Sequence, residues 1–249
     1  MKRRGRLKVF ESMAIQLRAA LIGGLLAMGS LEAARGQESS WRTALAGMPL
    51  SEPAKDLNRT NVARIMLGSF QSNRTVKALI LQPGATDEFY FFKRAKAVLD
   101  VDAPTLLDAV DALTNQTRIR VKFRPPFLLL HADDDPTEPL ATIRNRDLAA
   151  RLRTTPFLSH ALFNDHDWDH VQPILAKTLD VRFDPPVGSR DSWHFYRHAL
   201  AAWNLTGWEA LEAVSLANKT TFMLPKKGLR RRPLIRFEGD LRLTRPEAR

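Results

Sequence analysis

The sequence predicts an α/β or α+β fold in which small mixed sheets pack with amphipathic helices. Short apolar or alternating runs that suit strands, such as RIRVKF and FLLLHA, lie between longer segments with apolar residues at helical spacing. The order strand, helix, strand, strand occurs twice and indicates a possible duplicated unit. The 249 residues are 44% hydrophobic and include no cysteine, so the core must stabilise the fold without disulfides.

The N-terminal residues have the order of an export signal. Basic residues precede an apolar run of 13 residues at 19–31, and small residues then lead to Gly36. The run is shorter than the about 20 residues that span a bilayer. We therefore expect a signal peptide over residues 1–36, started at Met1 or Met13, and a periplasmic or secreted protein with no transmembrane segment after the signal.

An N-terminal α/β unit is expected over residues 37–155. Residues 37–75 look helical and polar, and VKALIL at 76–81 suits a strand. Thr105 marks the start of a helix with apolar residues three or four positions apart. RIRVKF alternates apolar residues with arginine or lysine, and FLLLHA is continuously apolar, so both are predicted strands and the second is buried.

A C-terminal α/β unit is expected over residues 156–249. It begins with a strand at 157–163 and a helix for which Asp167 or Asp169 is the expected cap. VRFDPP is extended. The aromatic stretch at 192–217 is predicted to form one long helix, because its large apolar residues recur three or four positions apart. TTFML and PLIRFEG then form a hairpin around a basic turn.

The segment VLDVDAPTLLDAVDALTNQTRIRVKFRPPFLLLHAD resembles the short domain at the N-terminus of secretins and TonB-dependent receptors. That family has a strand, a helix with the pattern T-L-x-x-A-L-x-x-L-x-x-Q-T-G, and two strands. The comparable positions are Thr105, Leu106, Ala109, Val110, Leu113, Gln116 and Thr117. Arg118 replaces the usual glycine, so the end of the helix is expected to differ.

This resemblance covers residues 98–132. It implies a periplasmic protein-interaction or scaffold module, with no catalytic residues to carry over. The full chain also resembles a group of exported proteins of Verrucomicrobia-like bacteria, and this likeness implies no particular activity.

The positive charge lies at the two ends of the chain. The formal net charge is +11, and residues 1–36 carry seven Lys or Arg and two Asp or Glu, which leaves +6 without them. Residues 226–249 have nine Lys or Arg and three Asp or Glu, so residues 37–225 are neutral. This distribution argues against nucleic acid as a partner.

In an exported protein the basic turn is instead a candidate for binding an anionic surface, such as anionic lipid or cell-wall polymer, or an acidic partner. Its cationic residues are Lys226, Lys227, Arg230, Arg231 and Arg232. The sequence favours a solvated hairpin turn over such binding.

The histidines suggest a metal site. All six lie between positions 131 and 198 and include two pairs whose members are four positions apart, so each pair faces one way if its segment is helical. With carboxylates they could bind zinc. The candidate ligands are His166, Asp169, His170, His194 and His198. The metalloprotease pattern needs glutamate after its first histidine, but Asp167 and Phe195 stand there. Structural histidines are the alternative.

Two other chemistries fit less well. HADDDP could supply Asp135 as the acid of a hydrolase triad, but no G-x-S-x-G occurs, and the nearest string, around Ser215, lies late in a predicted helix. The same aspartates lack the spacing of a calcium loop.

The sequence therefore predicts an exported, non-enzymatic binding or scaffold protein of the bacterial envelope, with no catalytic residues and no cofactor. The alternative is a zinc-dependent hydrolase that uses the histidine and aspartate cluster.

Overall fold

The computed structural model describes residues 40–82, 90–132, 141–157, 160–166, 168–183, 198–225 and 233–239. The chain divides into two units, Met1–Ser40 and Trp41–Arg249. The predicted signal peptide lies outside the described residues. Within the described ranges, no helix is both long enough and apolar enough to cross a membrane.

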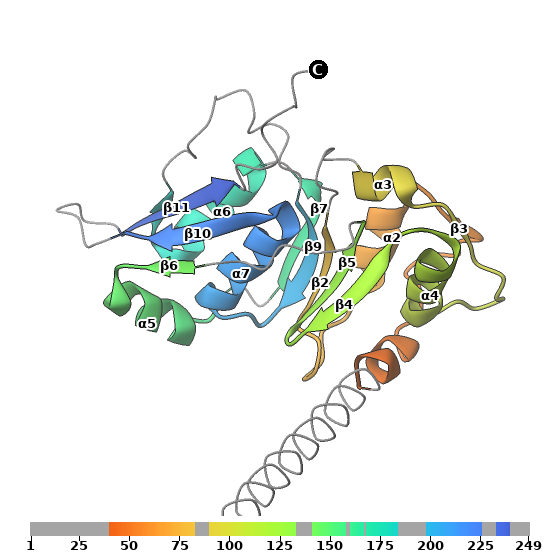
Figure 1. Ribbon diagram of the computed structural model, residues 1–249. Helices are drawn as coiled ribbons and strands as arrows, with labels where there is room; N and C mark the ends of the chain where they lie inside the picture. Colours follow the sequence, from red (N-terminus) through yellow and green to blue (C-terminus); the bar gives the residue numbers. More distant parts are fainter. Residues whose placement is uncertain are drawn as a thin grey trace, which may run out of the picture. The chain divides into compact units, whose positions relative to one another are not determined.

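The second unit mixes helices and strands along the chain (Figure 1). Residues 41–46 are helical. The labelled helices are α2 (Val62–Ser69), α3 (Tyr90–Arg94), α4 (Leu106–Gln116), α5 (Arg146–Thr154), α6 (Trp168–Leu179) and α7 (Gly207–Asn218). The strands are β1 (Asp56–Leu57), β2 (Ala78–Gln82), β3 (Ala97–Val98), β4 (Arg120–Arg124), β5 (Phe127–His131), β6 (Ala141–Ile143), β7 (His160–His166), β8 (Arg182–Phe183), β9 (His198–Trp203), β10 (Thr220–Leu224) and β11 (Leu234–Gly239).

A mixed central sheet organises the unit. Its five strands have the order β4-β5-β2-β9-β7, with β2 parallel to β5 and antiparallel to β9. A second sheet of four strands has the order β6-β10-β11-β8, and β1 pairs with β3. The prediction of mixed sheets packed with helices, in an α/β or α+β fold, is confirmed. The central sheet also takes strands from both of the predicted units, residues 37–155 and 156–249.

The central sheet buries both of its faces. Ala78 and Ile80 of β2 belong to a core that includes residues of α5, α6, α7 and the second sheet. Leu79 and Leu81 of the same strand belong to a core with residues 41–46, α2 and α4. Successive strand residues point to opposite faces, so a strand covered on both sides needs a continuous apolar sequence. This explains the apolar runs of β2 and β5.

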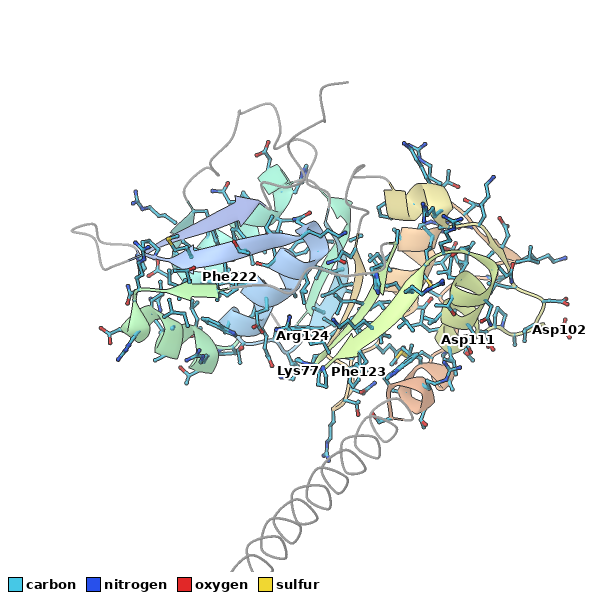
Figure 2. The ribbon with its side chains drawn as sticks, in the orientation of Figure 1. Lys77, Asp102, Asp111, Phe123, Arg124 and Phe222 are labelled. Atoms are coloured by element: carbon cyan, nitrogen blue, oxygen red, sulfur yellow. The ribbon has the colours of Figure 1, made fainter. Side chains whose placement is uncertain are left out.

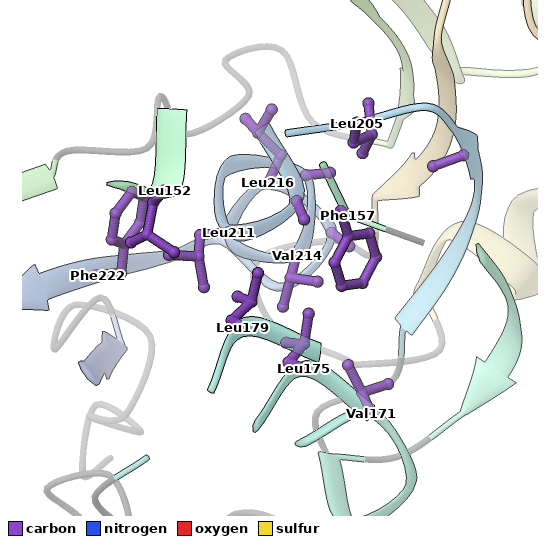
Figure 3. Packing of buried hydrophobic residues seen from close by; sticks show 14 of the residues in the cluster. Leu152, Phe157, Val171, Leu175, Leu179, Leu205, Leu211, Val214, Leu216 and Phe222 are labelled. Atoms are coloured by element: carbon purple, nitrogen blue, oxygen red, sulfur yellow. The ribbon is translucent and has the colours of Figure 1, made fainter. Parts of the chain in front are cut away.

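Helix α7 contacts both larger sheets, through β2 and β9 on one side and β10 on the other. Figure 3 shows Leu211 and Val214 of α7 among side chains from α5, α6 and β10. Nine of its twelve residues are buried. A helix that is apolar around most of its circumference is typical of such an internal position.

Two parts of the chain repeat the same local order. β3, α4, β4 and β5 run strand, helix, strand, strand, and so do β9, α7, β10 and β11. Thr105 and Thr206 each close a capping box at the start of the helix, and each forms an isolated bridge, with Pro49 and Pro156 respectively. Each helix leads into an antiparallel hairpin. The repeated order of elements is therefore present, with β9 rather than VRFDPP as the first strand of the second copy.

The prediction of one long helix over 192–217 is wrong. His198–Trp203 forms β9, the strand between β2 and β7. Asn204 turns the chain with a φ of 51°, and α7 begins at Gly207. Because β9 is covered on both faces, its apolar residues do not alternate with polar ones, and hydrophobic periodicity does not distinguish such a strand from a buried helix.

Other boundaries also differ from the prediction. Residues 37–75 are only partly helical, since β1 and α2 follow the helix at 41–46. The strand predicted at 157–163 is β7, which lies three residues later. Asp169 lies in the first turn of α6 and is not its cap, and Asp167 lies outside the described residues.

The central part of the chain follows the prediction closely. The helix after Thr105 is α4, RIRVKF contains β4, and FLLLHA contains β5. Hydrogen bonds from the Thr105 backbone amide and hydroxyl hold the pKa of Asp108 below its ordinary value. The predicted hairpin of TTFML and PLIRFEG is the pair β10 and β11.

Candidate functional site

The structure places the predicted metal ligands on different elements. His166 is the last residue of β7, and Asp169 and His170 are exposed at the start of α6. His198 is the first residue of β9, and His194 lies outside the described residues. The two histidines of each pair were expected to face one way if their segment were helical. Neither pair lies within one helix, because His166 and His198 are strand residues.

Strand pairing nevertheless brings one histidine of each pair close to one of the other pair. His166 and His198 are Cα partners in the antiparallel pairing of β7 and β9, after an irregularity between Phe163 and His166. Partners of this kind have Cα atoms about 4.5 to 5.5 Å apart. Among the described residues, no group of three or more His, Asp or Glu is placed to hold a metal ion.

The predicted anionic-surface residues, Lys226, Lys227, Arg230, Arg231 and Arg232, lie outside the described residues. Strand β10, which ends at Leu224 shortly before these residues, belongs to the described part of the chain. β6 runs parallel to β10, and the Arg144 amide donates a hydrogen bond of 2.9 Å to the Leu224 carbonyl. Arg144 and Arg146 are exposed, so further positive charge adjoins the end of β10.

Ser215 does not occupy a nucleophile elbow. It is fully buried within α7, and Asp135 lies outside the described residues. Next to Ser215, the Leu216 carbonyl accepts a hydrogen bond of 2.6 Å from Nε2 of Gln82, which is itself fully buried at the end of β2. Gln82 Oε1 and Ser215 Oγ have no hydrogen-bond partner among the described residues. Buried water commonly satisfies such atoms.

A row of basic side chains lies along the edge of the central sheet. Arg120, Lys122 and Arg124 alternate along β4, and we call them the β4 basic row. Their partners on β5 include Leu129 and Phe127, which belong to the same core as α7. The β4 basic row therefore lies on the α7 side of the sheet.

The opposite face of β4 is apolar. Val121 and Phe123 are partly buried and pack against the core formed with α2 and α4. Figure 2 shows Phe123 and Arg124 near the end of β4, close to Lys77, whose amide donates to the Pro126 carbonyl at 2.8 Å. β4 is thus a two-faced strand, basic on one side and apolar on the other.

The partly exposed flank of α7 carries the complementary acids. Lys77 Nζ lies 2.9 Å from Glu209 Oε1, in an ion pair whose side chains are 32% and 20% exposed. Glu209 also accepts a hydrogen bond of 2.7 Å from the Thr206 amide, which closes the capping box. One carboxylate therefore joins the start of α7 to the start of β2.

Glu212 is the second acid on this flank. Burial raises its pKa, while a hydrogen bond from the Trp208 side chain and the positive charge of Arg124 oppose that rise. The guanidinium of Arg153 lies 4.5 Å from the centre of the Trp208 ring, in a cation–π contact. Trp208 therefore contacts both Arg153 of α5 and Glu212, the carboxylate that interacts with Arg124 of β4.

Arg124 retains an unsatisfied donor in this setting. Its Nη1 is buried and has no hydrogen-bond partner among the described residues. A buried guanidinium nitrogen without an acceptor is costly, and carboxylate is the acceptor that matches its geometry best. The end of the β4 basic row is therefore suited to an additional anionic group.

The sequence predicted β4 as a strand with one apolar and one basic face, but did not identify it as a site. The alternation of RIRVKF predicted the two faces of β4, but the long helix predicted over 192–217 concealed the side of α7 that meets them. The informative signal was the capping box Thr206-x-x-Glu209, which fixes the start of α7 and places Trp208 and Glu212 one turn apart.

Comparison of the chain with protein-family models, curated proteins and solved structures found no match.

Proposed function

We propose that this chain is an exported, non-enzymatic binding or scaffold protein of the bacterial envelope, with an envelope protein or an anionic surface as its partner. The observation that carries the proposal is β4, a basic strand that forms an edge of the central sheet in the described part of the chain. The export signal predicted over residues 1–36 supports the location, and the resemblance of residues 98–132 supports the scaffold role.

The physical basis for binding is that the charged side chains of β4 are carried by a well-ordered sheet. β4 pairs with β5 along all five of its residues, and β5 is fully buried between two cores. Because the backbone of β4 is already ordered by this pairing, binding of a partner costs little backbone conformational entropy, which favours affinity.

Export is tested by fusing residues 1–36 to an alkaline phosphatase that is active only after it leaves the cytoplasm. We expect activity from this fusion, and none from a matched fusion in which Leu21 and Leu25 are replaced by arginine. Equal inactivity of both fusions would contradict the proposed location.

Binding is tested by photo-crosslinking in intact cells. A photoreactive amino acid at Lys122 of β4 is compared with one at Lys96, an exposed position before β3. We expect a discrete crosslinked product from position 122 that is absent from position 96. The same pattern from both positions would contradict a role for β4 in binding.

A zinc-dependent hydrolase is the second candidate, and the pairing of His166 with His198 is the observation that favours it. Metal analysis of the full chain, purified without a histidine tag, separates the two functions. Stoichiometric zinc that is lost in His170→Ala would support the hydrolase. Sub-stoichiometric zinc, with no thermal shift on addition of zinc or chelator, would eliminate it.

A further inference from the structure

We propose that β4 binds an extended acidic segment of a partner protein, which joins the central sheet as a sixth strand. This inference rests on the proposed binding function and names the chemistry of the partner. Strand addition to a sheet edge is a general mode of peptide recognition, in which backbone hydrogen bonds give affinity and side chains give specificity.

Strand addition first requires an edge strand with outward-pointing backbone hydrogen-bonding groups, and β4 is such a strand in the described part of the chain. Among the described residues, β5 is the strand paired with β4, and β4 ends the central sheet. On an edge strand, alternate N–H and C=O groups point away from the neighbouring strand. β4 is five residues long and its register with β5 has no interruption.

The other sheet edges are less suitable. β7 has a register irregularity between Phe163 and His166. β6 and β8, at the edges of the second sheet, have three and two residues. β4 is therefore the edge that offers a long, regular template within the described part of the chain.

The side chains of β4 determine what sequence would fit. An added strand places its side chains alternately beside the basic row and beside Val121 and Phe123, because strand side chains alternate between the faces of a sheet. Opposite charges across strands are favourable and like charges are not. The matching segment thus alternates acidic residues with apolar ones.

The environment of Arg124 strengthens the preference for an acid. Glu212 attracts Arg124, yet Nη1 of Arg124 remains without a hydrogen-bond partner among the described residues. Arg124 as a whole is only partly buried, so a carboxylate on an added strand can approach its guanidinium, and a charge-assisted contact of this kind is stronger than a neutral one.

The test measures binding of fluorescein-labelled peptides to the full chain by anisotropy. The main probe is a short peptide in which glutamate and valine alternate. The comparison peptides are one of the same composition with its glutamates in a block, one with lysine in place of glutamate, and one N-methylated at alternate residues. We expect the alternating peptide to bind about tenfold tighter than any of the three.

Two double variants locate the site. Arg120→Glu with Lys122→Glu is expected to weaken binding of the alternating peptide about tenfold or more. Lys55→Glu with Lys96→Glu makes the same change in net charge on exposed residues that precede β1 and β3, and is expected to leave binding unchanged. Hydrogen–deuterium exchange of the unaltered chain should show slower exchange in β4 when the peptide is present, which requires no variant to fold.

Several outcomes would overturn the proposal. Equal binding of the block or N-methylated peptide would show a charge contact without strand addition. Equal loss in both double variants would show general electrostatic attraction. Binding that appears only after Asp133, Asp134 and Asp135 are replaced by asparagine would show that β4 binds this acidic segment of the same chain and not a partner protein. None of these outcomes removes the in-cell crosslinking or export results, so failure here is distinguishable from failure of the proposed function.

Discussion

Gly207 shows how closely α7 is packed at its first residue. A Cβ added there would lie 2.7 Å from Leu179 Cδ2, 3.1 Å from Leu152 Cδ2 and 3.3 Å from the Leu152 carbonyl oxygen. Both leucines belong to the core, with 3% and 0% exposure, so neither can move without disturbing other contacts. The glycine is therefore required by space and not by backbone conformation.

Gly207→Ala is expected to destabilise the protein. Overpacking of a core costs about 1 to 3 kcal/mol, and the better helix propensity of alanine returns up to about 1 kcal/mol. For a unit of this size, a net loss of about 1 to 2 kcal/mol lowers Tm by about 2 to 8 °C. Thermal denaturation measures the change. Gly47→Ala is the control, because its Cβ would meet only the Ala44 carbonyl at 3.7 Å. Equal Tm values for both variants would refute the packing explanation.

Glu212 gives the flank of α7 a dependence on pH. Because burial raises its pKa in the folded state, the folded protein binds this proton more tightly than the unfolded chain does. The favourable contribution is present at low pH and is lost as pH rises through the raised pKa. At pH values above the ordinary pKa of glutamate, the raised pKa of Glu212 therefore lowers the stability of the folded state.

Glu212→Gln is expected to raise Tm at pH 7 and to lose this advantage below the ordinary pKa of glutamate, 4.5. The amide keeps an acceptor for the Trp208 side chain but removes the buried charge. Thermal melts of both proteins between acidic and neutral pH give the difference in Tm. A difference that stays constant with pH would show that desolvation of the carboxylate is not its cause.

At the scale of elements, the capping boxes define where α4 and α7 begin. The hydroxyl oxygens of Thr105 and Thr206 each accept a hydrogen bond from the backbone amide of the third helical residue, at 3.3 and 3.1 Å. The carboxylate at that third position accepts a hydrogen bond from the threonine amide. This pattern is readable in the sequence. Thr105 was correctly predicted to start α4, and the same capping pattern at Thr206 would have separated β9 from the helix.

Thr206→Ala is expected to reduce the free energy of unfolding by about 1 kcal/mol, the usual cost of removing such a cap. Thr206→Ser keeps the hydroxyl and is expected to retain most of the stability. Urea denaturation measures both changes. If the serine variant loses as much as the alanine variant, the methyl group of Thr206 and not its hydrogen bond is responsible.

Among strands covered on both faces, β2 and β5 were predicted because each is a short apolar run next to prolines, whereas β9 was not, because its apolar residues continue toward α7 at a spacing that also suits a helix. β4 alternates because one of its faces holds charged side chains, and its pattern specified both strand and orientation. β9 lacks that alternation because Ala199 and Ala201 enter one core while Leu200 and Ala202 enter the other. The same limit applies to the candidate site, since the meeting of β4 with α7 depends on strand order, which local sequence patterns do not encode.

At the scale of the whole molecule, the two predicted units share one sheet. β2 pairs with β5 on one side and with β9 on the other, and β9 follows β2 by more than a hundred residues in the chain. The core on the α7 side likewise combines Ile80 and Leu129 with residues of α6, α7 and β11. The predicted boundary at 155/156 therefore separates residues that pack together in the core on the α7 side of the central sheet.

This sharing predicts that neither residues 37–155 nor residues 156–249 fold alone. Without α7 and β9, the first fragment exposes the apolar face of β2 and β5 to water, and without β2 the second fragment loses the strand beside β9. Loss of that burial removes the main favourable term in folding. Far-UV circular dichroism should show no cooperative thermal transition for either fragment, whereas the two expressed together should recover one transition. A cooperative melt of residues 37–155 alone, near the Tm of the full chain, would contradict the single shared core and indicate an independent N-terminal domain.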